Sequence, residues 1–240
     1  MIEIHPVDGL PEIAEGDDLG ALIAGLAGLR NGDVVVVAQK VVSKAEGRVV
    51  RIEDVEASEQ ARELAGGRDP RELEVVLREA KRIVRARPPF LIAETRHGFV
   101  CASAGVDHSN APGPDTVVLL PLDPDGSARR IRATIRERAG ADVAVIVSDS
   151  FGRPFRHGTT DVAIGVAGMS PLLDLRGTTD RAGYVLRSSR VAIADELAAA
   201  ADLVRGKHDA IPVVVVRGVR TSGDGAATDL VMRAERDLFR

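Results

Sequence analysis

The chain has 240 residues, of which 45% are hydrophobic and 2% aromatic, and its 32 Lys and Arg against 36 Asp and Glu give a net charge of −4. This mild acidity argues against the basic excess that a nucleic-acid-binding protein needs. No apolar run approaches the roughly 20 residues of a membrane span, the N-terminus lacks a signal-peptide pattern, and the single cysteine excludes a disulfide framework, so we expect a cytoplasmic protein that binds no membrane.

Helices and strands alternate along the chain without a repeat. Apolar runs rich in β-branched residues predict strands, and apolar residues spaced by three and four predict helices. In chain order, we expect a strand at 2–5, a helix capped by Asp17 or Asp18 and reaching about 29, a strand at 34–38, helices within 57–87, a hairpin of 90–94 with 98–102, a strand at 117–121, a helix at 127–139, a strand at 143–147, a helix at 192–203, a strand at 212–216 and a helix at 229–239.

No Ser- or Pro-rich linker divides these elements. We therefore predict one continuous domain over residues 1–240, an α/β unit of mixed α+β character with mixed sheets and antiparallel hairpins. A simple doubly wound sheet fits this order less well.

The most informative segment is 143–158, Val-Ala-Val-Ile-Val-Ser-Asp-Ser-Phe-Gly-Arg-Pro-Phe-Arg-His-Gly. A buried strand runs into Asp149 and Ser150, and then into a predicted loop that carries Arg153 and Arg156. Carboxylate and hydroxyl oxygens are ligands for divalent metals, and guanidinium groups bind anions in a bidentate manner. The alternative is an ordinary strand end with polar capping residues.

Three other segments have a similar character. A Gly/Pro-bounded loop holds Asp107 and Asn110, whose carboxylate and carboxamide oxygens can ligate a hard metal ion or can form Asx turns. Lys44 follows a predicted strand, where it is either a phosphate ligand or a solvated lysine. The segment 217–225, Arg-Gly-Val-Arg-Thr-Ser-Gly-Asp-Gly, is either a backbone cradle for phosphate or a flexible connection.

The metal expected at such residues is a hard cation. The five histidines include no pair at metal-ligand spacing, and the lone cysteine makes a zinc site improbable. Oxygen donors favour Mg²⁺ or Mn²⁺. No Walker or Rossmann glycine motif occurs, so a nucleotide must be held in another way.

Three long motifs give the chain a resemblance to a known family. They are residues 32–48 (Gly-Asp-Val-Val-Val-Val-Ala-Gln-Lys-Val-Val-Ser-Lys-Ala-Glu-Gly-Arg), 98–110 (Gly-Phe-Val-Cys-Ala-Ser-Ala-Gly-Val-Asp-His-Ser-Asn) and 148–156 (Ser-Asp-Ser-Phe-Gly-Arg-Pro-Phe-Arg). The chain resembles the coenzyme F420-0:L-glutamate ligase (gamma-glutamyl ligase) family from Leu10 onward. The resemblance implies an unusual α/β fold, an intertwined homodimer and a site for two divalent metals, Mg²⁺ or Mn²⁺, and it leaves a role for K⁺ open. Some relatives carry a fused nitroreductase-like C-terminal domain, which we do not expect here.

The resemblance also assigns roles to residues. Asp107 and Asp149 match metal-binding carboxylates, and Ser150 matches a ligand of the second metal. Contacts to the guanine nucleotide are matched by Leu10, Pro11, Glu12, Ile13, Gln39, Lys44 and Asn110, and less sharply by the segment that includes Gly218, Thr221, Ser222 and Gly223. Some relatives have a further metal-binding acid in that segment, whereas here no acid precedes Asp224.

The implied reaction is the GTP-dependent addition of L-glutamate to the lactyl carboxylate of coenzyme F420-0, followed by γ-linked glutamates. Phosphoryl transfer from GTP would form an acyl phosphate, which the glutamate amine attacks. In this reaction Lys44 would neutralise nucleotide phosphate, and Arg153 and Arg156 would bind either the coenzyme phosphodiester or glutamate carboxylates. Two alternatives remain, namely a metal-dependent small-molecule kinase and a non-catalytic nucleotide- or coenzyme-binding module.

Overall fold

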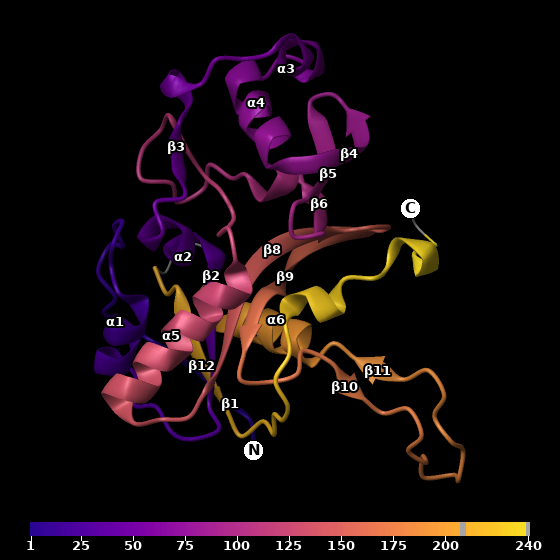
Figure 1. Ribbon diagram of the computed structural model, residues 1–240. Helices are drawn as coiled ribbons and strands as arrows, with labels where there is room; N and C mark the ends of the chain where they lie inside the picture. Colours follow the sequence, from indigo (N-terminus) through magenta and orange to yellow (C-terminus); the bar gives the residue numbers. More distant parts are fainter. Residues whose placement is uncertain (207–209, 239–240) are drawn as a thin grey trace.

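The computed structural model describes residues 1–206 and 210–238. At its centre lies a five-stranded sheet with the strand order β1-β12-β2-β8-β9 (Figure 1). Strands β2 and β8 are parallel, and the other neighbouring pairs are antiparallel. The five strands, in sheet order, are β1 Glu3–Pro6, β12 Val213–Arg217, β2 Val34–Ala38, β8 Ala144–Arg153 and β9 Arg156–Ala167.

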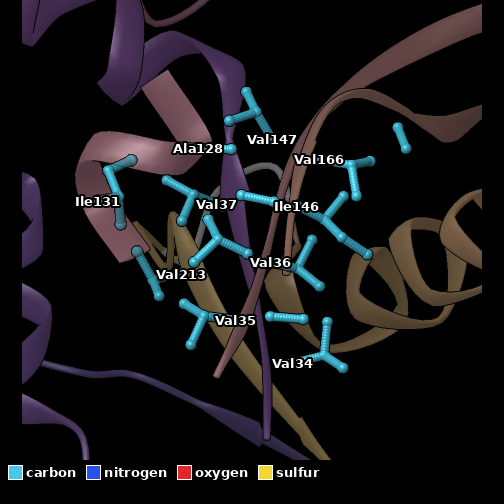
Figure 2. Close-up of a cluster of buried hydrophobic side chains, with 14 of the residues drawn as sticks. Val34, Val35, Val36, Val37, Ala128, Ile131, Ile146, Val147, Val166 and Val213 are labelled. Carbon is cyan, nitrogen blue, oxygen red and sulfur yellow. The ribbon is translucent and has the colours of Figure 1, made fainter. Parts of the chain in front are cut away.

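The sheet is buried on both faces. Val34, Val35, Val36 and Val37 of β2 are all fully buried, and successive residues of a strand point to opposite faces. Figure 2 shows these valines between Ala128 and Ile131 of α5 (Pro124–Ala139) on one side and α6 (Ile193–Arg205) on the other. Two shorter helices flank this core, namely α1 Leu19–Leu26 and α2 Gln39–Ala45.

A small lobe, residues 49–118, lies above the central sheet, on the side where the pairing of β2 with β8 ends at Ala38 and Ser148 (Figure 1). It has hydrophobic clusters of its own, which centre on Leu73 and Leu91 and on Ile52 and Val117. The lobe therefore packs largely on itself. Its elements are β3 Val49–Arg51, α3 Glu59–Leu64, α4 Pro70–Glu79, β4 Ala80–Arg87, β5 Phe90–Thr95, β6 Val100–Ala102 and β7 Thr116–Val118.

These elements confirm the prediction of a mixed α/β protein with several sheets and antiparallel hairpins, including the hairpin of β5 and β6. The helical interpretation of 57–87 is wrong beyond Glu79, because β4 pairs with β5 there. The pairing contains register shifts between Ala80 and Arg82 and between Ile83 and Arg85. These irregularities interrupt the two-residue alternation of a strand, so the apolar spacing looks helical.

Two other predictions are corrected. The expected helix at 229–239 is replaced, within the described residues, by two short 3₁₀ turns, Ala227–Leu230 and Ala234–Arg236, and residue 239 lies outside the described part. The expected loop after Ser150 is instead a continuation of β8, which returns as β9 after a two-residue turn at 154–155.

A two-stranded arm, β10 Leu173–Asp174 and β11 Arg190–Val191, projects away from the sheet (Figure 1). Among the described residues, no helix is both long enough and apolar enough to pass through a bilayer.

Candidate functional site

Two cavities adjoin where the pairing of β2 with β8 ends, beneath the small lobe. The first, which we call the acidic cavity, has a volume of about 310 Å³ and is lined by Asp107, Asp149 and Asp161. The second, the loop cavity, has a volume of about 470 Å³ and is lined by residues 10–13 and 210–212 together with Lys44. The residues that line both cavities form a neck between them: Ala38, Lys40, Asn110, Arg205 and Gly206.

The sheet register explains why the cavities form here. Ala38 of β2 lies opposite Ser148 of the parallel strand β8, so both strands reach this edge together. Asp149 follows Ser148 directly, and α2 begins directly after Ala38. The carboxyl ends of adjacent parallel strands are a common location for ligand sites in α/β proteins.

Asp149 is the most perturbed acid of the site. Enclosure by the protein raises its pKa to about 7, and the negative charges of Asp161 and Asp107 add to this effect. The backbone N–H of Ser150 and the charge of Lys40 oppose it only partly. A carboxylate in this setting is deprotonated most readily when a cation is bound beside it.

Asp107 reaches the same cavity from the small lobe. Its backbone pairs with Val118, and its Oδ2 accepts a hydrogen bond from Lys40 Nζ at 2.5 Å. Burial raises the pKa of Asp107, but the hydrogen bonds from Lys40 and Ser109 outweigh burial and lower it overall. The Ser109 N–H donates to Asp107 Oδ1 at 3.0 Å, so the Asx turn considered from the sequence is present together with the cavity position.

Asp161 and Arg205 were not among the sequence-predicted site residues. Asp161 lies opposite Ser150 in the β8–β9 pairing and accepts hydrogen bonds from Ser150 Oγ at 2.6 Å and Ser148 Oγ at 2.9 Å. Arg205, at the end of α6, donates from Nη1 to Asp161 Oδ2 at 2.6 Å. The signal that could have found Asp161 is the hairpin itself, because its register places residue 161 beside residue 150.

In the loop cavity, several of the predicted nucleotide residues lie together. Leu10, Pro11, Glu12 and Ile13 line one side, and Lys44 Nζ donates to Glu12 Oε1 at 2.5 Å. Lys40 and Lys44 are one helical turn apart in α2, which brings both to the same side of that helix.

Gln39 has a structural contact in addition to its place in the acidic cavity. It is buried, and its Nε2 donates to Ser43 Oγ at 2.6 Å and to the Leu119 carbonyl at 2.8 Å. Its amide therefore joins α2 to the chain that leaves the small lobe. Asn110 lies in the neck with a positive φ of 56°.

The structure does not bring Arg153 and Arg156 into either cavity. Both are exposed beside the turn between β8 and β9, where Arg153 Nη2 donates to the His157 carbonyl at 3.0 Å.

The segment that contains Gly218, Thr221, Ser222 and Gly223 also lies away from both cavities. Strand β12 is antiparallel to β2, so it carries this segment to the opposite end of the sheet, where Arg217 pairs with Asp33. The connection that does line the loop cavity is Gly206 and residues 210–212, which precede β12; residues 207–209 lie outside the described part.

No three His, Cys, Asp or Glu side chains within residues 1–206 and 210–238 are grouped closely enough to hold a metal ion by themselves. The acidic cavity instead offers carboxylates on separate elements together with the Ser150 hydroxyl. These are hard oxygen donors, and they suit Mg²⁺ or Mn²⁺ better than a soft metal.

Known proteins of one family resemble this chain over its whole length. A family model described as F420-0:gamma-glutamyl ligase matches residues 9–218. Three curated relatives are named coenzyme F420:L-glutamate ligase. The relative from Methanothermobacter thermautotrophicus is 44% identical, with 100% of this chain and 99% of the relative covered. The relative from Methanopyrus kandleri is 47% identical, with 100% and 98% covered, and that from Archaeoglobus fulgidus is 41% identical, with 100% and 96% covered.

Proposed function

The chain belongs to the F420-0:gamma-glutamyl ligase family, and from this we propose that it joins L-glutamate to the terminal lactyl carboxylate of coenzyme F420-0 and then adds further glutamates by γ-linkage. We propose GTP as the energy source. The observation that carries the proposal is the pair of adjoining cavities, one acidic and one lined by a loop and a lysine, at the point where the parallel strands β2 and β8 stop pairing.

The loop cavity suits the nucleoside part of GTP. Residues 10–13 and 210–212 supply backbone and apolar surface, and Lys44 supplies a positive charge at the cavity wall. A nucleotide seated there would direct its phosphates through the neck toward Asp107 and Asp149.

The acidic cavity suits divalent cations. The high pKa of Asp149 means that its carboxylate lacks a sufficient counter-charge in the protein alone, and a bound cation would supply one. Asp107, Asp149 and the Ser150 hydroxyl would hold two such ions, Mg²⁺ or Mn²⁺. When bound, they would neutralise phosphate charge during transfer.

The proposed reaction has two steps, phosphoryl transfer followed by amide formation. An oxygen of the lactyl carboxylate attacks the γ-phosphorus of GTP, the bond to the β-phosphate oxygen breaks, and GDP leaves. The glutamate amine then attacks the acyl carbon, an amide bond forms, and phosphate leaves as the amine loses a proton. The protein's contribution is to align the two substrates and to stabilise the negative charge of the phosphates.

The test is mass spectrometry of the product formed from F420-0, L-glutamate, GTP and Mn²⁺, together with measurement of GDP. We expect product mass increments of one or more glutamyl units, and GDP release that depends on both glutamate and F420-0. GDP release from F420-0 without glutamate would indicate a small-molecule kinase instead. Absence of both product and Mn²⁺ binding would indicate a non-catalytic binding module.

A further inference from the structure

Arg205 occupies an unusual position in the neck between the two cavities. It is the last residue of α6, its exposed fraction is 8%, and it lines both the acidic cavity and the loop cavity. Its Nη1 donates to Ser148 Oγ at 3.0 Å and to Asp161 Oδ2 at 2.6 Å. One edge of the guanidinium group is therefore held by the β8–β9 hairpin.

The other nitrogens of Arg205 are buried without an acceptor. Neither Nε nor Nη2 has a hydrogen-bond partner among the described residues. Buried donors of a charged group are rarely left unsatisfied, because each unmade hydrogen bond costs free energy. These two donors at a cavity wall therefore indicate that an acceptor from outside the described part of the chain binds there.

The geometry indicates which acceptor this is. Nε and Nη2 form one edge of a planar fork, which matches two oxygens of a phosphate group. The other cation of the neck, Lys40, already contacts Asp107 and Ser109. A ligand with its nucleoside in the loop cavity and its reacting end beside Asp107 and Asp149 must pass its phosphate chain through the neck.

We propose that Arg205 binds phosphate oxygens of the nucleotide through Nε and Nη2, while Nη1 keeps Asp161 and the two serines aligned. This inference rests on the proposed function, because it assumes a nucleoside triphosphate in the two cavities. The competing interpretation is that Arg205 is only the buried counter-ion of Asp161.

Calorimetric titration of GTP and of guanosine, each with Mn²⁺, separates these interpretations. Arg205→Met should weaken GTP binding by about 10- to 100-fold, the effect of losing hydrogen bonds to a charged group, and should leave guanosine affinity unchanged. Equal GTP affinities in the variant and the wild type would overturn the proposal, as would an equal loss for GTP and guanosine.

A matched control is available at the opposite end of the same sheet. Arg217 pairs with the buried Asp33 through Nη2 at 2.7 Å, and it lines neither cavity. Arg217→Met removes a similar ion pair, so it should lower thermal stability without changing GTP affinity. If Arg205→Met does not fold, the same GTP titration is made with Arg205→Lys. A single ammonium group cannot bind both Asp161 and a phosphate, so the GTP affinity of this variant should still fall by about tenfold.

A failure of the proposed function would be recognised separately. If the wild type makes no glutamylated product, the ligase assignment is wrong, and Arg205 is then tested with inorganic tripolyphosphate and Mn²⁺. Tighter binding of tripolyphosphate to the wild type than to Arg205→Met would support the phosphate contact. Equal affinities, or no binding to the wild type, would overturn it.

Discussion

At the scale of single residues, the pKa values of two acids that line the acidic cavity, Asp107 and Asp149, shift in opposite directions. Asp107 has a lowered pKa because Lys40 and Ser109 donate to it, whereas enclosure raises the pKa of Asp149 to about 7. The same cavity therefore offers one acid that is already ionised and one whose ionisation is favoured by a bound cation.

We expect Asp149→Asn to reduce glutamate-dependent GTP turnover by at least about 100-fold, because the amide keeps the volume of the side chain but removes a charge that holds the metals. The measurement is GDP release under saturating Mn²⁺, with circular dichroism to establish folding. Asp115→Asn makes the same chemical change on an exposed residue that lines neither cavity, and it should be active. Wild-type turnover by Asp149→Asn would contradict the metal assignment.

The stability of the metal-free protein should depend on pH through Asp149. Its folded-state pKa of about 7 lies above its ordinary value of 3.8, so between these values the folded state keeps a proton that the unfolded state has lost. The contribution of Asp149 to the free energy of unfolding therefore decreases as pH rises through this interval and is level above it. Urea denaturation in EDTA at several pH values measures the decrease, and Asp149→Asn should flatten it. An identical slope in wild type and variant would refute this attribution.

Metal affinity should follow the opposite trend. Because Mn²⁺ binds the ionised carboxylate, its affinity should rise by up to about tenfold per pH unit below the Asp149 pKa and level off above about 7. Calorimetric titration of Mn²⁺ into the nucleotide-free protein measures this dependence. A Mn²⁺ affinity that is the same at pH values below and above about 7 would show that Asp149 is not a ligand.

At the scale of elements, α1 packs against α5 through a glycine. A Cβ on Gly20 would lie 2.5 Å from Thr134 Cβ and 2.9 Å from the Ile131 carbonyl, whereas a Cβ on Gly25, in the same helix, would meet nothing within 4 Å. The close approach of the two helices therefore depends on the missing side chain at residue 20.

This difference gives a paired prediction within one helix. Gly20→Ala should lower the free energy of unfolding by about 1–3 kcal/mol through overpacking. Gly25→Ala should raise it by roughly 0.5–1 kcal/mol, because alanine favours an exposed helical position. Chemical denaturation of both variants beside the wild type measures the two changes. A loss of stability in Gly25→Ala equal to that in Gly20→Ala would contradict the packing explanation.

The sequence predicted strands best where the apolar run was continuous, as in β2, and the acid that follows such a strand, Asp149, was found for the same reason. Asp161 was missed because its position depends on pairing across a hairpin. The family resemblance assigned the segment after β12 to nucleotide binding, whereas its glycines alone left a phosphate cradle and a flexible connection open. Its actual location follows from the antiparallel direction of β12, which local composition does not encode.

At the scale of the whole molecule, apolar side chains are exposed on its two projecting parts. Phe155, at the β8–β9 turn, has an exposed fraction of 89%, and Tyr184 and Val185, between β10 and β11, have fractions of 60% and 48%. The β8–β9 hairpin and the β10–β11 arm both project in Figure 1. An apolar side chain on a projecting segment is removed from water when a second chain packs against it, which is favourable. We propose that two copies of the chain associate as a homodimer through these segments.

Multi-angle light scattering tests this proposal. The wild type should show about twice the 25.4 kDa mass of one chain at micromolar concentration, and Tyr184→Asp should shift the average toward a single chain by introducing a charge into the contact. A dilution series of each protein provides the control for concentration. A wild-type mass near 25.4 kDa throughout the series would refute the homodimer.

The position of Asp107 on a separately packed lobe has a further consequence. Asp149 belongs to the central sheet and Asp107 to the lobe of residues 49–118, so the gap between their carboxylates depends on how these two parts of the chain are placed against each other. An ion that both acids ligate would act as a cross-link between the two parts, so the free energy of holding them at the required separation would be part of its binding free energy. By reciprocity, a substitution that favours this placement of the two parts would tighten ion binding without changing a ligand.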